Sequence, residues 1–208
     1  MEEDVYFTVK KRASAEIKVK GSRFIGHAAP IKSREEADSF VKEVSKKYYD
    51  ATHNCFAYKV DIKELSLFRT SDAGEPSGTA GKPILNAIEG LGLTNVVCVV
   101  TRYFGGIKLG TGGLARAYSE CARETLKRGE KVKRFQTATI KIVLSYELTG
   151  VVMNLISAHD CQIENTVYGS EVEMVLRIRQ ASIDRFKQNL IDSTSGRVKI
   201  LREEVSTR

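Results

Sequence analysis

Helical periodicity and short apolar runs alternate through the first half of the chain. Ser33 and Glu36 form a capping box, and the apolar residues that follow recur every three or four positions as far as Tyr48, which predicts a helix. Residues 23–31 and 55–60 are apolar runs that predict strands on either side of this helix.

The most apolar segment is residues 96–100, with the sequence VVCVV, which predicts a central strand buried on both faces. A short helix that begins at Pro83 and ends at Gly90 is expected before it. A long amphipathic helix is expected after it, beginning near Gly112, with Tyr118 among its inward positions.

The pattern changes after a polar, basic connection at residues 129–134. Residues 135–208 show the order strand, helix, strand, strand, helix, strand, with Gly169 and Ser170 at the turn between the two middle strands. That order is the ferredoxin-like arrangement of two split βαβ units. We therefore predict an α+β protein with two domains, residues 1–134 and residues 135–208.

Glycine is concentrated in the first of these domains. Ten of the 16 glycines lie between Ser71 and Tyr118, mostly in two polar loops at residues 71–83 and 101–114. Glycine is costly to order and adds no side chain to a core, so this concentration indicates positive φ angles or a backbone that lies close to another group. Because charged and hydroxyl side chains flank the glycines, a polar or anionic ligand is favoured.

Net charge is also uneven along the 208 residues. Residues 1–134 hold 24 lysines and arginines against 17 acidic residues, a net charge of +7, whereas residues 135–208 hold nine of each kind. An acidic partner of the first domain, such as nucleic acid, a phosphorylated ligand or an acidic protein, accounts for this asymmetry. Solubility alone is the alternative explanation.

Composition indicates a cytoplasmic protein. No run approaches the roughly 18 apolar residues of a membrane span, and the acidic start at residues 1–4 lacks the layout of a signal peptide. The four cysteines include no CxxC pair, and the three histidines are widely separated. We therefore expect reduced thiols, no membrane association and no metal site.

The two standard phosphate-binding motifs do not fit the glycine loops. Lys82 is followed by Pro83, where a Walker A motif needs Ser or Thr. The dinucleotide fingerprint is met only formally, by Gly110, Gly112 and Ala115, and without the required tight turn between strand and helix. No cofactor is therefore expected.

A more general anion site remains possible at the second glycine loop. A helix that begins near Gly112 presents free backbone N–H groups and the positive end of its dipole, with cationic side chains nearby in sequence. The alternative is a loop that packs tightly on a neighbouring strand and leaves its cations in solvent. The candidate ligand-binding residues of the two loops are Asp72, Glu75, Gly78, Thr79, Gly81, Lys82, Arg102, Gly105, Gly106, Lys108, Gly110, Gly112, Gly113 and Arg116.

Side chains suited to catalysis are sparse. Asp72 and Glu75 could bind Mg²⁺ or act as acid and base, although such residues more often cap turns and helices. His53 and Cys55 could form a nucleophilic pair in principle, but we expect them to point to diverging sides of the strand start. No catalytic residue is assigned.

The glycine loops resemble a known family. Residues 71–81 and 101–114 closely resemble the IMPACT family, which includes bacterial YigZ-like proteins, and residues 53–57 and 21–24 fit the same pattern. The family often has a second acid where Ala73 stands. The resemblance implies a ribonuclease PH-like α/β fold for the first domain, as in a small-subunit ribosomal protein domain. It implies that the second domain is similar to domains of elongation factor G.

The resemblance also implies a link to translation, since eukaryotic relatives regulate its initiation by competing for the co-activator of the kinase that senses uncharged tRNA. We expect a non-enzymatic, translation-associated binding protein that contacts RNA, the ribosome or another anionic partner. One alternative is an enzyme that acts on a phosphorylated or nucleotide substrate, with Asp72 or Glu75 as base or Mg²⁺ ligand. The other is a protein–protein adaptor. An open basic groove would favour nucleic-acid binding, and a closed pocket with convergent carboxylates would favour the enzyme. An exposed apolar patch would favour the adaptor.

Overall fold

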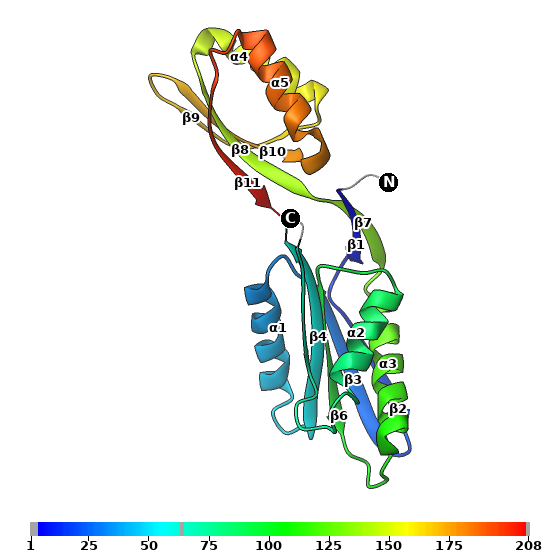
Figure 1. Ribbon diagram of the computed structural model, residues 1–208. Coiled ribbons are helices and arrows are strands. Elements are labelled where there is room, and N and C mark those ends of the chain that lie inside the picture. The colour runs from blue at the N-terminus through cyan, green and yellow to red at the C-terminus, as the bar shows by residue number, and fades with distance from the viewer. Residues whose placement is uncertain (1–3, 63–64, 207–208) are drawn as a thin grey trace. The chain divides into compact units, whose positions relative to one another are not determined.

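The computed structural model describes residues 4–62 and 65–206 and combines helices with antiparallel sheets, so the chain is α+β (Figure 1). It divides into two compact units. The larger unit spans Tyr6–Arg134, and the smaller unit combines the residues up to Val5 with those from Phe135 onward. The larger unit thus differs from the predicted domain 1–134 at its first residues.

The larger unit is built on a five-stranded antiparallel sheet. In spatial order its strands are β2 (Ala13–Val19), β3 (Ser22–Pro30), β6 (Val96–Tyr103), β4 (His53–Ile62) and β5 (Leu65–Ser71). The predicted central position of β6 is confirmed, and seven of its eight residues are buried. Arg23 lies opposite Tyr103, and His53 lies opposite Arg102. The starts of β3 and β4 therefore meet the end of β6 at one end of the sheet.

Helices cover both faces of this sheet (Figure 1). They are α1 (Arg34–Lys47), α2 (Gly81–Gly90) and α3 (Gly110–Arg128). Phe40 of α1 packs in one core with Val97 of β6, whereas Ile84 of α2 and Leu126 of α3 pack in a second core with Cys98. Neighbouring side chains of β6 point to opposite faces of the sheet, so the central strand contributes to both cores.

The segment after α3 is a strand. β7 (Lys131–Phe135) pairs with β1 (Val5–Val9) in a two-stranded sheet. The prediction that residues 129–134 serve only as a connection is therefore wrong. Backbone pairing with β1 forms this strand, and its largely charged side chains give no apolar alternation that would reveal it. β1 is in turn held by the hydrogen bond from the Thr94 N–H to the Phe7 carbonyl at 2.8 Å.

The smaller unit has a four-stranded antiparallel sheet in the order β11-β8-β10-β9. Its elements are β8 (Thr137–Leu144), the 3₁₀ turn Tyr146–Leu148, α4 (Thr149–Ala158), β9 (Gln162–Tyr168), β10 (Val172–Arg179), the 3₁₀ turn Gln180–Ser182, α5 (Ile183–Thr194) and β11 (Lys199–Ser206). Ile140, Leu176 and Phe186 are fully buried in its core. In neither unit does a described helix have the length and apolar character needed to cross a membrane.

Asp4 completes the smaller unit. Its carboxylate accepts hydrogen bonds from Arg179 at 2.9 and 3.1 Å, and its carbonyl accepts one from the Gln136 N–H at 2.7 Å. The bonds from Arg179 lower the pKa of Asp4, although burial opposes this shift. The first described residue of the chain is therefore held by a side chain and a backbone N–H that lie far along the sequence.

Candidate functional site

The two glycine loops meet in a buried polar cluster at the end of β6. The side chain of Glu75, from the first loop, is 3% exposed, and that of Arg102, from β6, is 6% exposed. Arg102 Nη1 donates to Glu75 Oε1 at 2.6 Å, and the Tyr118 hydroxyl of α3 donates to the same oxygen at 2.8 Å. Arg102 Nη2 donates to Ser22 Oγ at 3.3 Å. We call these four residues the Glu75 cluster.

The ion pair favours a structural role for Arg102. Its charge is balanced by a buried carboxylate of the same chain, which matches the alternative in which the second loop packs tightly and holds no external anion. Its Cζ atom also lies 5.5 Å from the ring centroids of both Phe24 and Phe104. Arg102 is therefore a structural residue that joins the two loops.

Asp72 is also engaged by the protein itself. Its carboxylate accepts the backbone N–H groups of Gly78, Ala80 and Gly81 at 2.8 to 2.9 Å. Burial raises the pKa of Asp72, but these three donors together lower it below the ordinary value of 3.8. Gly81 is the first residue of α2, so Asp72 shapes the first loop and satisfies free donors at the start of that helix.

These partners favour a structural role for Asp72 and Glu75 over the alternative in which one of them is a base or a Mg²⁺ ligand. Both carboxylates already accept two or more hydrogen bonds from within the chain. Within residues 4–62 and 65–206, no group of three or more His, Cys, Asp and Glu side chains is placed to hold a metal ion.

We expect Asp72→Ala to lower the free energy of unfolding by about 1–2 kcal/mol, because three backbone donors lose their acceptor. Since folding lowers the pKa of Asp72, its contribution is present above pH 3.8 and is lost as the pH falls through the folded-state value. Urea unfolding of both proteins across this range tests the prediction. Asp72→Asn keeps one acceptor oxygen and should lose less. A deficit of Asp72→Ala that persists unchanged at pH 2–3 would contradict the assignment.

His53 and Cys55 correct a second expectation. Residues two apart on a strand share a face, so they do not diverge. His53 Nε2 lies 3.9 Å from Glu75 Oε1, and the Cys55 thiol lies 3.4 Å from the Tyr118 hydroxyl. Burial raises the pKa of Cys55 to about 12, however, which leaves the sulfur protonated and unreactive at neutral pH. His53 Nδ1 donates to the Ala73 carbonyl at 2.9 Å and so positions the first loop.

Close packing explains one glycine of the second loop. A Cβ atom on Gly105 would lie 1.9 Å from the carbonyl carbon of Gly21, in the turn between β2 and β3. The Gly105 N–H donates to Ser22 Oγ at 3.2 Å, which connects this contact to the Glu75 cluster. This part of the loop therefore matches the alternative of tight packing against a neighbouring strand.

The start of α3 lies close to its predicted position near Gly112. The helix begins two residues earlier, at Gly110, which has a φ of +71°. Gly112 lies inside the helix, and a Cβ atom there would meet only Arg116 Nη1, at 3.8 Å. The glycine required by the backbone is therefore Gly110, whose left-handed conformation disfavours other residues.

The remaining candidates are divided between loop structure and solvent. Thr79 is buried and donates to the Pro76 carbonyl at 2.6 Å. Lys82, Lys108 and Arg116 are exposed, and they have no ion pair within the described part of the chain. Gly78, Gly106 and Gly113 lie in the loops or the first turn of α3. Thus Glu75 and Arg102 belong to the Glu75 cluster, Gly105 contacts it through Ser22, and Asp72 binds Gly81 within the first loop. Lys108, Gly110, Gly112 and Arg116 form the open start of α3.

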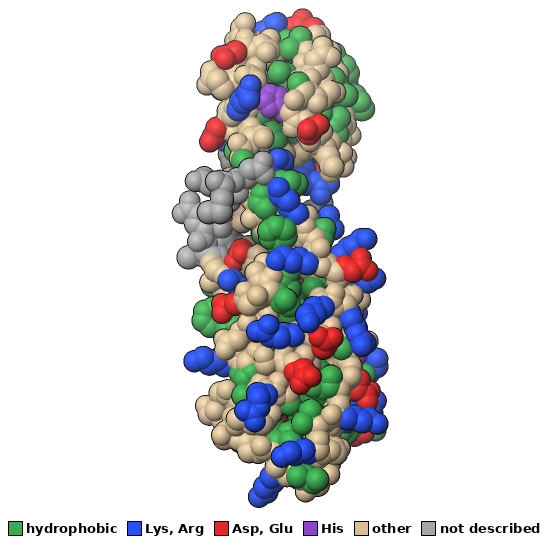
Figure 2. Space-filling view, turned by 90° about the vertical axis from the view of Figure 1, so that its right-hand side faces the viewer, with side chains coloured by type: hydrophobic (Ala, Val, Ile, Leu, Met, Phe, Trp, Pro, Cys, Tyr) green, Lys and Arg blue, Asp and Glu red, His purple; other side chains and the backbone are tan. Residues whose placement is uncertain are grey.

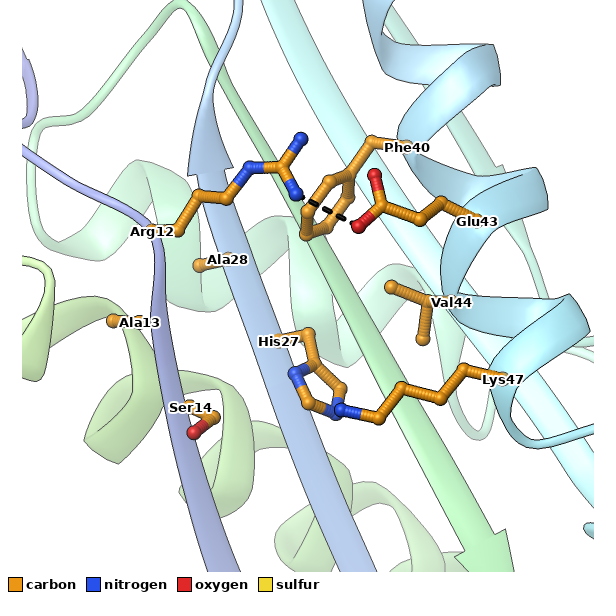
Figure 3. A pocket seen from close by; sticks show the side chains of 9 residues that line it. All are labelled: Arg12, Ala13, Ser14, His27, Ala28, Phe40, Glu43, Val44 and Lys47. Atoms are coloured by element: carbon orange, nitrogen blue, oxygen red, sulfur yellow. Dashed lines mark hydrogen bonds and ion pairs between the residues drawn. The ribbon is translucent and has the colours of Figure 1, made fainter.

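A hollow of about 280 Å³ lies elsewhere, between β2, β3 and α1 (Figure 3). Arg12 Nη1 donates to Glu43 Oε1 at 2.7 Å across it, and His27 Nε2 lies 3.1 Å from the Tyr48 hydroxyl. Burial, together with the positive charge of Lys47, lowers the pKa of His27. None of the predicted site residues lines this hollow.

Sequence reasoning did not identify Tyr118 or Ser22 as site residues, and it considered His53 only as a partner of Cys55. Tyr118 lies at an inward position of α3, and the pattern does not distinguish a core tyrosine from one that donates to a buried carboxylate. Ser22 and His53 lie in the segments 21–24 and 53–57, whose family pattern was the one available signal.

Comparisons with known proteins agree with this architecture. Residues 20–126 match the Impact N-terminal domain, and residues 142–197 match a domain of unknown function (DUF1949). A crystal structure described as that of a hypothetical protein superposes with a TM-score of 0.72 at 30% identity, covering 95% of this chain and 97% of the other.

Similar sequences occur in bacteria and in eukaryotes. The IMPACT family member YvyE of Bacillus subtilis is 34% identical over 97% of this chain and 92% of its own. YigZ of Escherichia coli is 34% identical over 88% of this chain and 90% of its own. Protein IMPACT of Xenopus laevis is 34% identical over 50% of this chain and 34% of its own. From the matched domain and these full-length similarities, the chain belongs to the IMPACT family.

Proposed function

We propose that this chain is a non-enzymatic, translation-associated regulatory protein of the cytoplasm that binds RNA, free or ribosomal, through its larger unit. The link to translation is what the family resemblance implies. The observation that supports RNA binding is the division of charge between the units. Residues 6–134 hold 24 basic and 14 acidic residues, a net charge of +10, whereas the rest of the chain holds nine and 12, a net charge of −3.

The distribution of these charges suits a long anionic partner. Lysine and arginine side chains are spread over the face of the larger unit seen in Figure 2, with fewer acidic side chains among them. Lys108 and Arg116 stand at the open start of α3, where backbone N–H groups add to their attraction for phosphate. A spread of cations favours contacts to many phosphates over recognition of one small anion.

The fold assignments belong to the same proposal. We assign the larger unit to the ribonuclease PH-like class and the smaller one to the ferredoxin-like class, similar to domains of elongation factor G. The β-α-β-β-α-β order and the strand order β11-β8-β10-β9 support the second assignment. Binding is favoured over catalysis because both loop carboxylates have internal partners.

We expect the purified protein to bind single-stranded RNA with a strong salt dependence. A plot of log K against log salt should have a slope of about −0.7 for each phosphate contacted. The double variant Lys108→Gln/Arg116→Gln should make the slope less negative by about 1.4, because two contacts are lost. Fluorescence anisotropy of a labelled oligonucleotide, titrated at several salt concentrations, measures both quantities.

Arg185→Gln provides the matched control, since Arg185 is an exposed cation on α5 of the smaller unit. The slope of log K against log salt for this variant should equal that of the unmodified protein. An affinity that does not change with salt, or no binding to RNA at low salt, would refute the proposed function.

A further inference from the structure

One end of the larger unit's sheet carries exposed aromatic rings. Tyr49 follows α1 and is 86% exposed, and Phe104 follows β6 and is 48% exposed. Their segments lie side by side, because the Thr52 N–H donates to the Arg102 carbonyl at 3.0 Å and the Phe104 N–H donates to Thr52 Oγ1 at 3.1 Å. The loop from β6 to α3 forms this end of the unit (Figure 1).

Phe104 is supported by the buried cluster beneath it. The Arg102 guanidinium, fixed by Glu75 and Ser22, has its Cζ atom 5.5 Å from the Phe104 ring centroid. The Phe104 ring is thus held in place while about half of it stays in contact with solvent. A ring that is already ordered loses little conformational freedom when a flat ligand stacks on it.

Three lysines lie in the chain segments that meet at this end: Lys46 shortly before Tyr49, Lys108 shortly after Phe104, and Lys20 next to Gly21, which packs against Gly105. Lys20, Lys46 and Lys108 are exposed, and none of them has an ion pair within the described residues. Two acids at this end, Glu16 and Asp50, already accept hydrogen bonds, from an arginine and a tyrosine respectively. We call the following residues the end surface: Tyr49, Phe104, Lys20, Lys46 and Lys108.

Exposed rings between unpaired lysines match the chemistry of a nucleic acid strand. Phosphates pair with ammonium groups, and bases stack on aromatic rings only where they are not paired in a duplex. The net charge of +10 on this unit disfavours a basic protein partner and favours a polyanion.

We propose that the end surface binds single-stranded RNA, with unpaired bases stacked on Phe104 and Tyr49 and phosphates on the lysines. This inference rests on the proposed function and adds to it a position on the molecule and a preference for unpaired RNA. Stacking accepts any base, so little sequence selectivity is expected.

The test compares ring variants with lysine variants by fluorescence anisotropy. The probe is a labelled single-stranded RNA of about 12 nucleotides, alongside its blunt duplex. Tyr49→Ala and Phe104→Ala should each weaken binding to the single strand by roughly five- to 100-fold and leave the salt slope unchanged. Lys46→Gln should instead make the slope of log K against log salt less negative by about 0.7, because one phosphate contact is lost. Tyr49→Phe should retain the affinity, because the ring remains.

Phe68→Ala is the matched control. Phe68 is a 63% exposed ring on the edge strand β5, and its removal should not change binding. Because Tyr49 is almost fully exposed, Tyr49→Ala remains informative even if Phe104→Ala disturbs the loop. If the protein binds RNA but both ring variants bind as tightly as the unmodified chain, the stacking proposal is overturned and the proposed function stands. If the unmodified protein binds no RNA at all, both the stacking proposal and the proposed function are overturned. This is the result expected if the rings contact a protein partner instead.

Discussion

Glu75→Ala should lower the free energy of unfolding of the larger unit by about 3–5 kcal/mol, because it leaves the Arg102 guanidinium buried without its counter-ion. The two side chains are 3% and 6% exposed, so water cannot readily replace the carboxylate. The Tyr118 hydroxyl loses its acceptor in the same variant. Hydrogen exchange of β6 and α3 peptides, read by mass spectrometry, reports this unit separately from the smaller one.

Two further variants show whether charge or packing is responsible. Glu75→Gln keeps an acceptor oxygen without the charge and should lose less than Glu75→Ala. Glu75→Leu combined with Arg102→Met removes both charges, so it should recover much of the stability that either single change loses. A loss below about 1 kcal/mol for Glu75→Ala would mean that Arg102 reaches solvent and that the Glu75 cluster is not a stabilising element.

Gly105→Ala should destabilise the larger unit by about 1–3 kcal/mol, because the added methyl group has no room. Its Cβ atom would lie within 2.3 Å of the Gly21 carbonyl group and of the Ser22 nitrogen. These are backbone atoms, so relief requires the loop or the β2–β3 turn to move. Such a movement also breaks the hydrogen bond from the Gly105 N–H to Ser22 Oγ. Thermal unfolding and hydrogen exchange of the β2–β3 turn measure the effect.

Gly112→Ala is the control for this variant. A Cβ atom on Gly112 would make only an ordinary contact with Arg116 Nη1 at 3.8 Å, and Gly112 lies in the first turns of α3. Alanine should therefore be neutral or should stabilise the helix by up to about 1 kcal/mol. If Gly105→Ala and Gly112→Ala behave alike, the contact between the two loop backbones does not restrain the structure.

The sequence was sufficient to predict those helices and strands that are determined by a few neighbouring residues. The run at 96–100 predicted the centre of β6, and Ser33 predicted the start of α1, where Ser33 Oγ accepts the Glu36 N–H at 3.3 Å. The predicted capping box is incomplete, however. The Glu36 carboxylate accepts the N–H of Lys32, the residue before Ser33, at 2.8 Å.

The site depended on contacts that no local pattern contains. Glu75 lies in the first glycine loop and Arg102 near the end of β6, and only the pairing of β4 with β6 and the packing of α3 bring them together with Tyr118. A glycine-rich loop beside cations therefore suggested an external anion, whereas one cation had an internal partner. β7 was missed for a related reason, since its strand conformation depends on pairing with β1, far away in sequence.

The bond between Asp4 and Arg179 has a consequence for folding during synthesis. The two residues are 175 positions apart, so Asp4 leaves the ribosome long before its partner is made. At about 5–20 residues per second, the interval is roughly 10–35 seconds. The sheet of the larger unit ends at Tyr103 and can form within that time. Asp4 can therefore form its ion pair with Arg179 only after every strand of that sheet has been synthesised.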